Sequence, residues 1–249
     1  MSYKIVLRCQ GGFCNRFRAI VSAVLWAEDM GARLEIYWPV EKGHMASPLE
    51  HLIDPKSITG LTYVHNGYIR AKQVLSVDDM KASIQASEYE VIIQSYSMFH
   101  DDLIYRTERG LAALRKIQIV SSLNDIADKV MPSSFDCNFV GIHIRRTDHV
   151  KCIAASPVSA FEKVVADNSG TRFLLATDDI EVKGRFYDLF GEAVVSPVET
   201  LGRLTEHQQE MGIVDWILLQ RCQKIYASAG SSFSELAAWR AGIELICVY

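Results

Sequence analysis

The sequence has little of what marks several large classes of protein. Its six cysteines are scattered without a CxxC pair, a pattern that fits neither a zinc site nor the disulfide framework of a small secreted protein. No apolar run approaches the ~20 residues that a membrane-spanning helix needs. The net charge of −4 argues against a general nucleic-acid binder. We therefore expect a soluble protein whose thiols are reduced and mostly buried.

The N-terminal residues also lack the pattern of a secretory signal. The sequence MSYKIVLRCQGG enters a strand-like segment at once, and no apolar stretch with a small-residue cleavage site precedes it. We expect a cytoplasmic protein with no signal peptide, membrane anchor or transmembrane segment.

Strand-like and helix-like segments alternate along most of the 249 residues, and 49% of the residues are hydrophobic, enough for a sizeable core. Strands are predicted at 4–9, 33–38, 61–64, 73–75, 89–94, 139–145, 172–177, 193–195, 224–228 and 244–248. Helices are predicted at 16–30, 77–86, 107–115, 122–130, 158–167, 180–189, 207–222 and 232–240. The segment MPSS at 131–134 is the best candidate linker, because its proline stops a helix. The pattern predicts an α/β fold with an N-terminal domain at 1–132 and a Rossmann-like domain at 133–249.

The most informative segment is FVGIHIRRTD at 139–148, which predicts a buried strand with polar residues at its carboxyl end. Strand residues alternate between faces, so His143 and Arg145 share one side of this strand. The segment then reaches Arg146 and Asp148, where a loop begins. Ligands bind at the carboxyl ends of strands in open parallel sheets, and a guanidinium suits a phosphate. Arginines that merely form ion pairs at the end of an internal strand are the alternative.

Two loops of small residues follow predicted strands. In GGFCNR at 11–16, two glycines allow close approach of a ligand, and the following helix offers free N–H groups to an anion. The loop is neither GxGxxG nor a P-loop, so an NAD-dependent oxidoreductase is the least favoured of the functions considered. In SAGSSFSE at 228–235, Ser232 and Glu235 predict a capping box, and the small residues before it leave room for a ligand.

Three carboxylates, at two places in the chain, are further candidates. Asp178 and Asp179 end one predicted strand and open a helix, where a capping role alone would explain them. Asp215 lies in the apolar helical stretch IVDWILL, and a carboxylate there is usually paired or bound to something. A carboxylate can accept the two adjacent N–H donors of guanine, although local N–H groups could also satisfy it.

Taken together, these segments resemble the GDP-fucose-dependent fucosyltransferases. GIHIRRTD at 141–148 is similar to the HxRRTD signature of the α1,6 type, FLLATDD at 173–179 to its second motif and VDWILLQRCQKIYASAGSSFSELA at 214–237 to its third. The GGFCNR loop is similar to the family's N-terminal glycine loop, whereas residues 40–130 match nothing recognisable.

The resemblance implies a GT-B-like fold, in which two Rossmann-like domains face each other across a cleft, and an inverting transfer of fucose from GDP-fucose to a glycan acceptor. It implies no metal and no cofactor besides the donor substrate. Carried over by position, it assigns Arg145 to the β-phosphate, Arg146, Asp148 and Asp178 to shaping and supporting the site, His143 and Asp215 to the guanosine, and Gly11, Gly12, Cys14, Asn15, Ser231 and Ser232 to the remaining donor contacts.

One departure from the family concerns the general base. The family's animal α1,6 enzymes carry a glutamate five residues after the aspartate of the signature, and Ile153 stands at that position here. His149, His44, Asp101 and Glu41 are the other candidate bases. A glycosyltransferase with a different nucleotide sugar, or a nucleotide-binding pseudoenzyme, therefore remain alternatives.

Overall fold

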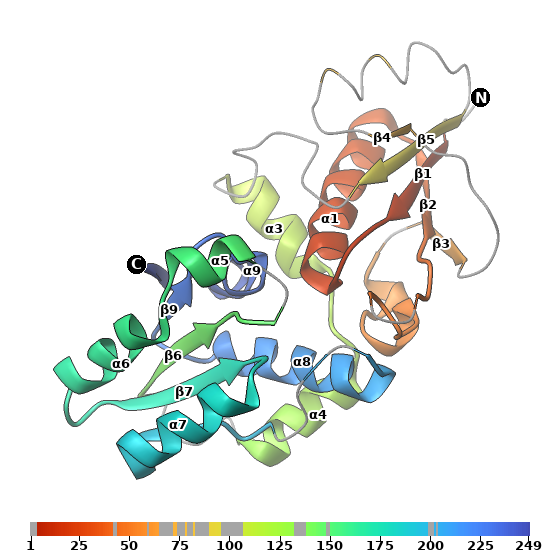
Figure 1. The fold of residues 1–249 in the computed structure, drawn as a ribbon. Coiled ribbons are helices and arrows are strands. Elements are labelled where there is room, and N and C mark those ends of the chain that lie inside the picture. Colours follow the sequence, from red (N-terminus) through yellow and green to blue (C-terminus); the bar gives the residue numbers. More distant parts are fainter. Residues whose placement is uncertain are drawn as a thin grey trace. The chain divides into compact units, whose positions relative to one another are not determined.

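The computed structural model describes residues 4–41, 44–58, 60–64, 72–73, 78, 82, 90–95, 107–131, 138–147, 150–198, 202 and 204–249. The chain forms two compact units, each with its own parallel sheet (Figure 1). The first comprises Met1–Val120 with Leu204–Glu206, and the second comprises Ser121–Arg203 with His207–Tyr249.

This division lies N-terminal to the predicted boundary at residue 132, because helix α4 (Ser121–Val130) belongs to the second unit. Arg221 explains the assignment. Its Nη2 forms a 2.8 Å ion pair with Asp128, and its Nη1 donates a 2.9 Å hydrogen bond to the carbonyl of Met131. The rest of the predicted linker, at 132–134, lies outside the described residues.

The first unit contains a five-stranded parallel sheet in the order β3-β2-β1-β5-β4. Its elements are β1 (Lys4–Cys9), α1 (Phe13–Met30), β2 (Arg33–Tyr37), β3 (Leu61–Val64), β4 (Lys72–Gln73), β5 (Glu90–Ser95) and α3 (Glu108–Lys116), with short 3-10 turns at Leu49–His51 and Pro55–Ser57. Helix α1 buries Phe17, Ile20 and Leu25, which lie at helical spacing. Gly31 ends it in the left-handed conformation.

The second unit contains a five-stranded parallel sheet in the order β10-β9-β6-β7-β8. Its elements after α4 are β6 (Phe139–Ile144), α5 (Val150–Ala155), α6 (Val158–Asp167), β7 (Arg172–Thr177), α7 (Ile180–Phe190), a 3-10 turn at Gly191–Ala193, β8 (Val194–Val195), α8 (Glu206–Leu219), β9 (Lys224–Ser228), α9 (Ser232–Ala241) and β10 (Glu244–Val248).

The core of the second unit shows which face each helix covers. Val140, Ile142 and Ile144 of β6 pack with Phe161 of α6 and Phe186 of α7. On the opposite face, a Cβ added at Gly141 would meet Leu219 of α8, so α8 covers that face. Because strand residues alternate, His143 lies on the α8 side of the sheet.

Both sheets reverse their strand order beside the first strand of the unit. In the second unit the chain runs from β6 to β7 in one direction and returns to place β9 on the other side of β6. The equivalent point in the first unit lies between β1 and β5. Ligands of open α/β sheets bind outside the carboxyl ends of the strands at such a switch point.

The sequence placed most of these elements correctly but missed α5, which the prediction left as loop. The predicted helix at 77–86 lies almost entirely outside the described residues. None of the helices in the described part of the chain has the length and apolar character that crossing a bilayer requires.

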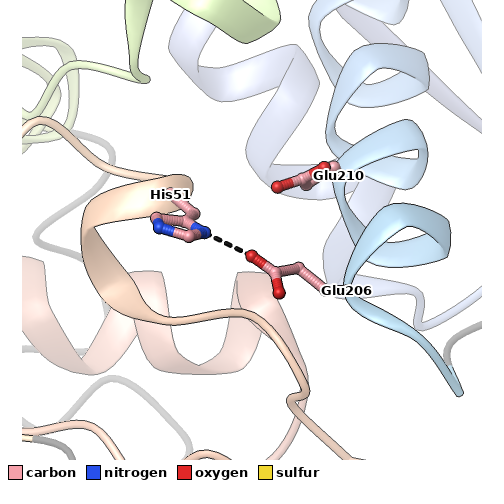
Figure 2. Close-up of side chains that lie close together, drawn as sticks. All are labelled: His51, Glu206 and Glu210. Atoms are coloured by element: carbon pink, nitrogen blue, oxygen red, sulfur yellow. Dashed lines mark hydrogen bonds and ion pairs between the residues drawn. The ribbon is translucent and has the colours of Figure 1, made fainter.

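The chain rejoins the first unit at Leu204–Glu206, just before it continues along α8. The imidazole of His51 and the carboxylate of Glu206 share a hydrogen bond (Figure 2). The hydroxyl of Ser47 also donates a 3.2 Å hydrogen bond to the carbonyl of Glu206. These contacts fix where the polypeptide leaves the first unit for the last time.

Candidate functional site

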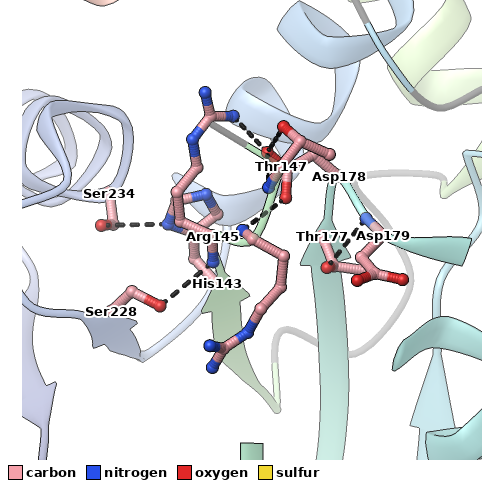
Figure 3. Close-up of polar contacts among 9 residues, drawn as sticks. His143, Arg145, Thr147, Thr177, Asp178, Asp179, Ser228 and Ser234 are labelled. Carbon is pink, nitrogen blue, oxygen red and sulfur yellow. Dashed lines mark hydrogen bonds and ion pairs between the residues drawn. The ribbon is translucent and has the colours of Figure 1, made fainter. Parts of the chain in front are cut away.

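Asp178 connects the ends of β6 and β7. Its carboxylate forms a 2.5 Å ion pair with Nη1 of Arg145 and accepts a 2.8 Å hydrogen bond from the backbone N–H of Arg146 (Figure 3). It also accepts a 2.7 Å hydrogen bond from the hydroxyl of Thr147 and a 3.4 Å bond from the Thr147 N–H. Asp178 therefore fixes both the Arg145 guanidinium and the loop that follows β6. Thr147 was not among the predicted site residues.

The same loop is bonded to the end of β9. The backbone N–H of Arg145 donates a 3.0 Å hydrogen bond to the hydroxyl of Ser228, the last residue of β9. Arg145 thus lies at the switch point of the second sheet, whereas the sequence predicted only that it lies at the carboxyl end of a strand. Ser228 was expected only as part of a small-residue loop, and nothing in the sequence marks it as a partner of Arg145.

His143 is a buried neutral imidazole. Burial and the neighbouring Arg145 lower the pKa of His143 to about 3. Its ring stacks on that of Phe233 at 4.8 Å, and its Nδ1 lies 3.2 Å from the hydroxyl of Ser234. That hydroxyl donates its single proton to the carbonyl of Ser231, so it accepts from His143. Nδ1 therefore carries the imidazole proton, and Nε2 is an acceptor.

The Arg146 guanidinium bonds to the end of helix α5, whereas that of Arg145 bonds to Asp178. Its guanidinium donates to the carbonyl of Ile153 at 3.4 Å and to the carbonyl of Ser156. A cation at the last carbonyls of a helix is stabilised by the helix dipole. Burial lowers the pKa of Arg146. This geometry gives Arg146 a supporting position, which the resemblance also implied.

Ser156, whose carbonyl accepts from Arg146, also links this loop to the ends of β9 and β10. Its hydroxyl donates a 2.6 Å hydrogen bond to the carbonyl of Val248 and accepts a 2.9 Å bond from the backbone N–H of Ala229. Ser156 is fully buried. Sequence reasoning missed Ser156 because it also missed α5, the helix that ends just before it.

The loop after β9 differs from the predicted capping box. Ser231, not Ser232, is the N-cap of α9, and its carbonyl accepts the first helical bond, from the N–H of Glu235 at 3.2 Å. Ser232 already has helical geometry as the first residue of α9. The turn before it needs Gly230 in the left-handed conformation, with φ of 74°. The prediction was therefore shifted by one residue.

Asp215 is a carboxylate buried in α8. Its side chain is 6% exposed, and its Oδ1 is buried with no hydrogen-bond partner. Burial raises the pKa of Asp215 to about 8, although the charge of Lys183 opposes this effect. Lys183 is itself buried and donates a 2.8 Å hydrogen bond to the carbonyl of Val198. Asp215 can therefore accept hydrogen bonds that the protein does not supply.

Asp179, in contrast, caps α7 by accepting from the N–H groups of Glu181 and Val182.

The glycine loop lies at the switch point of the first sheet. The N–H of Gln10 donates a 3.2 Å hydrogen bond to the carbonyl of Ser95, at the end of β5. Gly12 is the N-cap of α1 and has no side chain that could accept a hydrogen bond from the first turn of the helix. Cys14 is buried, and the Asn15 side chain accepts a 2.8 Å hydrogen bond from Arg18.

Several predicted residues lie elsewhere. Asp148, His149 and Asp101 lie outside the described residues. Glu41 and His44 belong to a tight turn closed by a bridge between Glu41 and Met45. The Ile153 side chain is exposed on α5.

No protein-family model matches this chain, and neither does any curated protein sequence. Solved structures do match. The NodZ α1,6-fucosyltransferase co-crystallised with GDP is 18% identical, with a TM-score of 0.64 over 95% of this chain and 92% of that chain. NodZ from Bradyrhizobium, in a further crystal structure, has a TM-score of 0.65 at 18% identity over 95% and 91% of the two chains. POFUT1 in complex with GDP-fucose is 9% identical, with a TM-score of 0.61 over 99% and 98%. This chain therefore has the fold of the NodZ fucosyltransferase and of POFUT1.

Proposed function

We propose that this protein is an inverting glycosyltransferase that moves fucose from GDP-fucose to a hydroxyl of a glycan acceptor. The observation that carries the proposal is the position of Arg145, which Asp178 holds at the switch point of a parallel sheet. The shared fold with NodZ and POFUT1 supports the choice of donor. The GT-B arrangement and the domain roles predicted from the sequence are part of this proposal.

The proposed chemistry separates a guanosine diphosphate from a sugar. The bond between the anomeric carbon of fucose and the β-phosphate oxygen breaks, and the acceptor oxygen forms the new bond from the opposite face. Negative charge then grows on the departing diphosphate. Arg145 and the N–H groups of Gly12 and Cys14 stabilise that charge, so the reaction requires no metal. Gly11 and Asn15 shape the loop, and Ser231 and Ser232 assist at the phosphates.

The guanosine contacts follow from the two buried titratable groups. Asp215 offers a carboxylate without a protein partner for its Oδ1, and guanine has two adjacent N–H donors that it can bind. His143 offers an acceptor at Nε2. Arg146 and Asp148 support the loop around Arg145.

The acceptor hydroxyl must lose its proton to a base, and the position of the family glutamate cannot supply one. Ile153 has an aliphatic side chain there, exposed on α5. This observation favours a nucleotide-binding pseudoenzyme as the second candidate. A glycosyltransferase with a different nucleotide sugar would release either a different nucleoside diphosphate or GDP from a sugar other than fucose.

A thermal-shift experiment tests nucleotide binding. GDP should raise the melting temperature, whereas UDP and ADP should not, because only guanine matches the Asp215 carboxylate. Arg145→Ala should abolish the GDP shift. Arg185→Ala is the matched control, since Arg185 is an exposed arginine that pairs with Glu162. Equal shifts with GDP and ADP, or a full shift in Arg145→Ala, would contradict the proposal.

Turnover separates the enzyme from the pseudoenzyme. GDP release from GDP-fucose is measured alone and with a panel of glycan acceptors. Acceptor-dependent release supports the transferase, whereas GDP binding without release over the whole panel favours the pseudoenzyme. Release from a different nucleotide sugar alone would identify a different donor.

A further inference from the structure

Arg16 is a fully buried arginine directly beneath the glycine loop. It belongs to α1 and is 0% exposed. Its Nε–H donates a 2.8 Å hydrogen bond to the carbonyl of Gly11, and its Nη1 donates a 2.8 Å bond to the carbonyl of Pro39. The guanidinium also lies 4.7 Å from the centre of the Trp38 ring. Arg16 is thus held from three directions, and one of them is the loop itself.

The bond to Gly11 determines where the next N–H group points. The described peptide bonds are all trans, and in a trans peptide the carbonyl oxygen and the amide hydrogen point in opposite directions. Because the Gly11 oxygen points at the buried Arg16, the N–H of Gly12 points away from Arg16. Gly11 has φ of 73°, and a Cβ there would lie 3.0 Å from the Asn15 amide nitrogen, so the loop conformation also requires glycine.

The charge of Arg16 is not fully compensated. Its Nη2 is buried without a hydrogen-bond partner. Burial lowers the pKa of Arg16 to about 10, while Cys9 and Glu41 oppose this effect, so the group stays charged at neutral pH. A buried cation is costly, and an apolar side chain would fill such a position at lower cost. The retained charge is explained if an anion binds at the loop.

We propose that Arg16 is a positioning residue for the diphosphate. It holds the Gly11 carbonyl inward so that the Gly12 N–H faces the phosphates, and its buried charge attracts them. This inference rests on the proposed function and adds a residue that never touches the donor.

The test compares GDP with guanosine, which lacks the phosphates. Their affinities are measured by calorimetry for the wild type, Arg16→Lys and Arg16→Met. Arg16→Met should weaken GDP binding by about 10–100-fold and leave guanosine binding unchanged. Arg16→Lys keeps the charge, but an ammonium cannot reproduce the two guanidinium hydrogen bonds to Gly11 and Pro39. Its loss of GDP affinity should therefore be intermediate. The matched control is Arg172→Met, because Arg172 lies 4.4 Å from the Phe139 ring at the start of β7, at the opposite end of that strand from Asp178.

The GDP-to-guanosine ratio separates positioning from folding, since a general loss of structure would weaken both ligands. If Arg16→Met does not fold by circular dichroism, Arg16→Lys decides. An unchanged ratio in the folded variants would overturn the role of Arg16 alone. A wild-type protein that fails to bind GDP would overturn the proposed function, and this inference with it.

Discussion

At the scale of single residues, Asp215 combines burial with a carboxylate oxygen that the protein leaves without a partner. Its pKa is raised from 3.8 to about 8. The folded protein therefore keeps a proton that the unfolded chain releases between these values. Stability from this group is present below pH 4 and is lost as the pH rises to about 8. Guanine N–H donors would instead favour the carboxylate, so a bound nucleotide should lower the pKa of Asp215.

Replacing Asp215 with asparagine separates stability from binding. The asparagine of Asp215→Asn cannot ionise. The free energy of unfolding should therefore fall less between pH 5 and pH 8 in this variant than in the wild type. Its GDP affinity should fall by about 10–100-fold, because the amide presents donors to the guanine donors. Denaturant unfolding at both pH values and GDP titration check these outcomes. Wild-type GDP affinity in Asp215→Asn would show that Asp215 does not bind the base.

Asp178 is the residue on which the loop after β6 depends. Asp178→Asn places an amide where the carboxylate accepts from Arg145, Arg146 and Thr147. The variant should lose about 1–3 kcal/mol of unfolding free energy and lose the GDP-induced thermal shift.

The adjacent aspartate provides the control for Asp178. Asp179→Asn should change neither property, because asparagine caps a helix as well as aspartate does. Equal behaviour of the two variants would mean that the contacts of Asp178 with Arg145, Arg146 and Thr147 contribute little to stability or to GDP binding.

At the scale of elements, periodicity and strand patterns predicted the sheet well. Strands β7, β9 and β10 have the predicted bounds, because buried parallel strands are short apolar runs between turns. Helix α5 was missed because it is too short for periodicity to detect, and the hydrogen bond from Arg146 to the carbonyl of Ile153 at its end has no signature in the sequence. The shifted N-cap of α9 has a similar cause, since several serines in succession offer equivalent capping positions. In the candidate site, the resemblance singled out Arg145, Arg146 and Asp178. Their bonding partners Thr147, Ser156 and Ser228 depend on tertiary contacts.

Close packing between β6 and α8 gives a prediction at this scale. A Cβ at Gly141 would lie 3.0 Å from a methyl carbon of Leu219 and 3.2 Å from Ile225. Gly141→Ala should therefore destabilise the protein by about 1–3 kcal/mol, since overpacking moves β6, the strand that ends just before Arg145.

Gly184 is the matched control within α7, because a Cβ there meets nothing within 4 Å. Gly184→Ala should stabilise the protein by up to about 1 kcal/mol through helix propensity. Denaturant unfolding measures both variants. If Gly141→Ala leaves the free energy of unfolding unchanged, α8 can move away from the sheet without cost.

At the scale of the whole molecule, the sequence could not locate the division between the units. The proline of the predicted linker is a local signal, whereas the assignment of α4 depends on contacts from Arg221, far along the chain. The return of Leu204–Glu206 to the first unit is likewise set by tertiary contacts of Ser47 and His51. Such contacts between distant segments have no signature in a single sequence.

The final prediction concerns the proposal that this protein, with a net charge of −4, binds GDP without a metal. If Arg145, Arg16 and the helix N-terminus of the glycine loop supply the positive potential, GDP binding needs no Mg²⁺. Free GDP at 100 times its Kd should then stabilise the protein by about 2.7 kcal/mol, or about 5–10 °C in Tm. The shift should be the same in a chelator as in Mg²⁺, and Arg145→Ala should lack it in both. A shift that appears only with Mg²⁺ would mean that the side chains are not sufficient to bind the diphosphate.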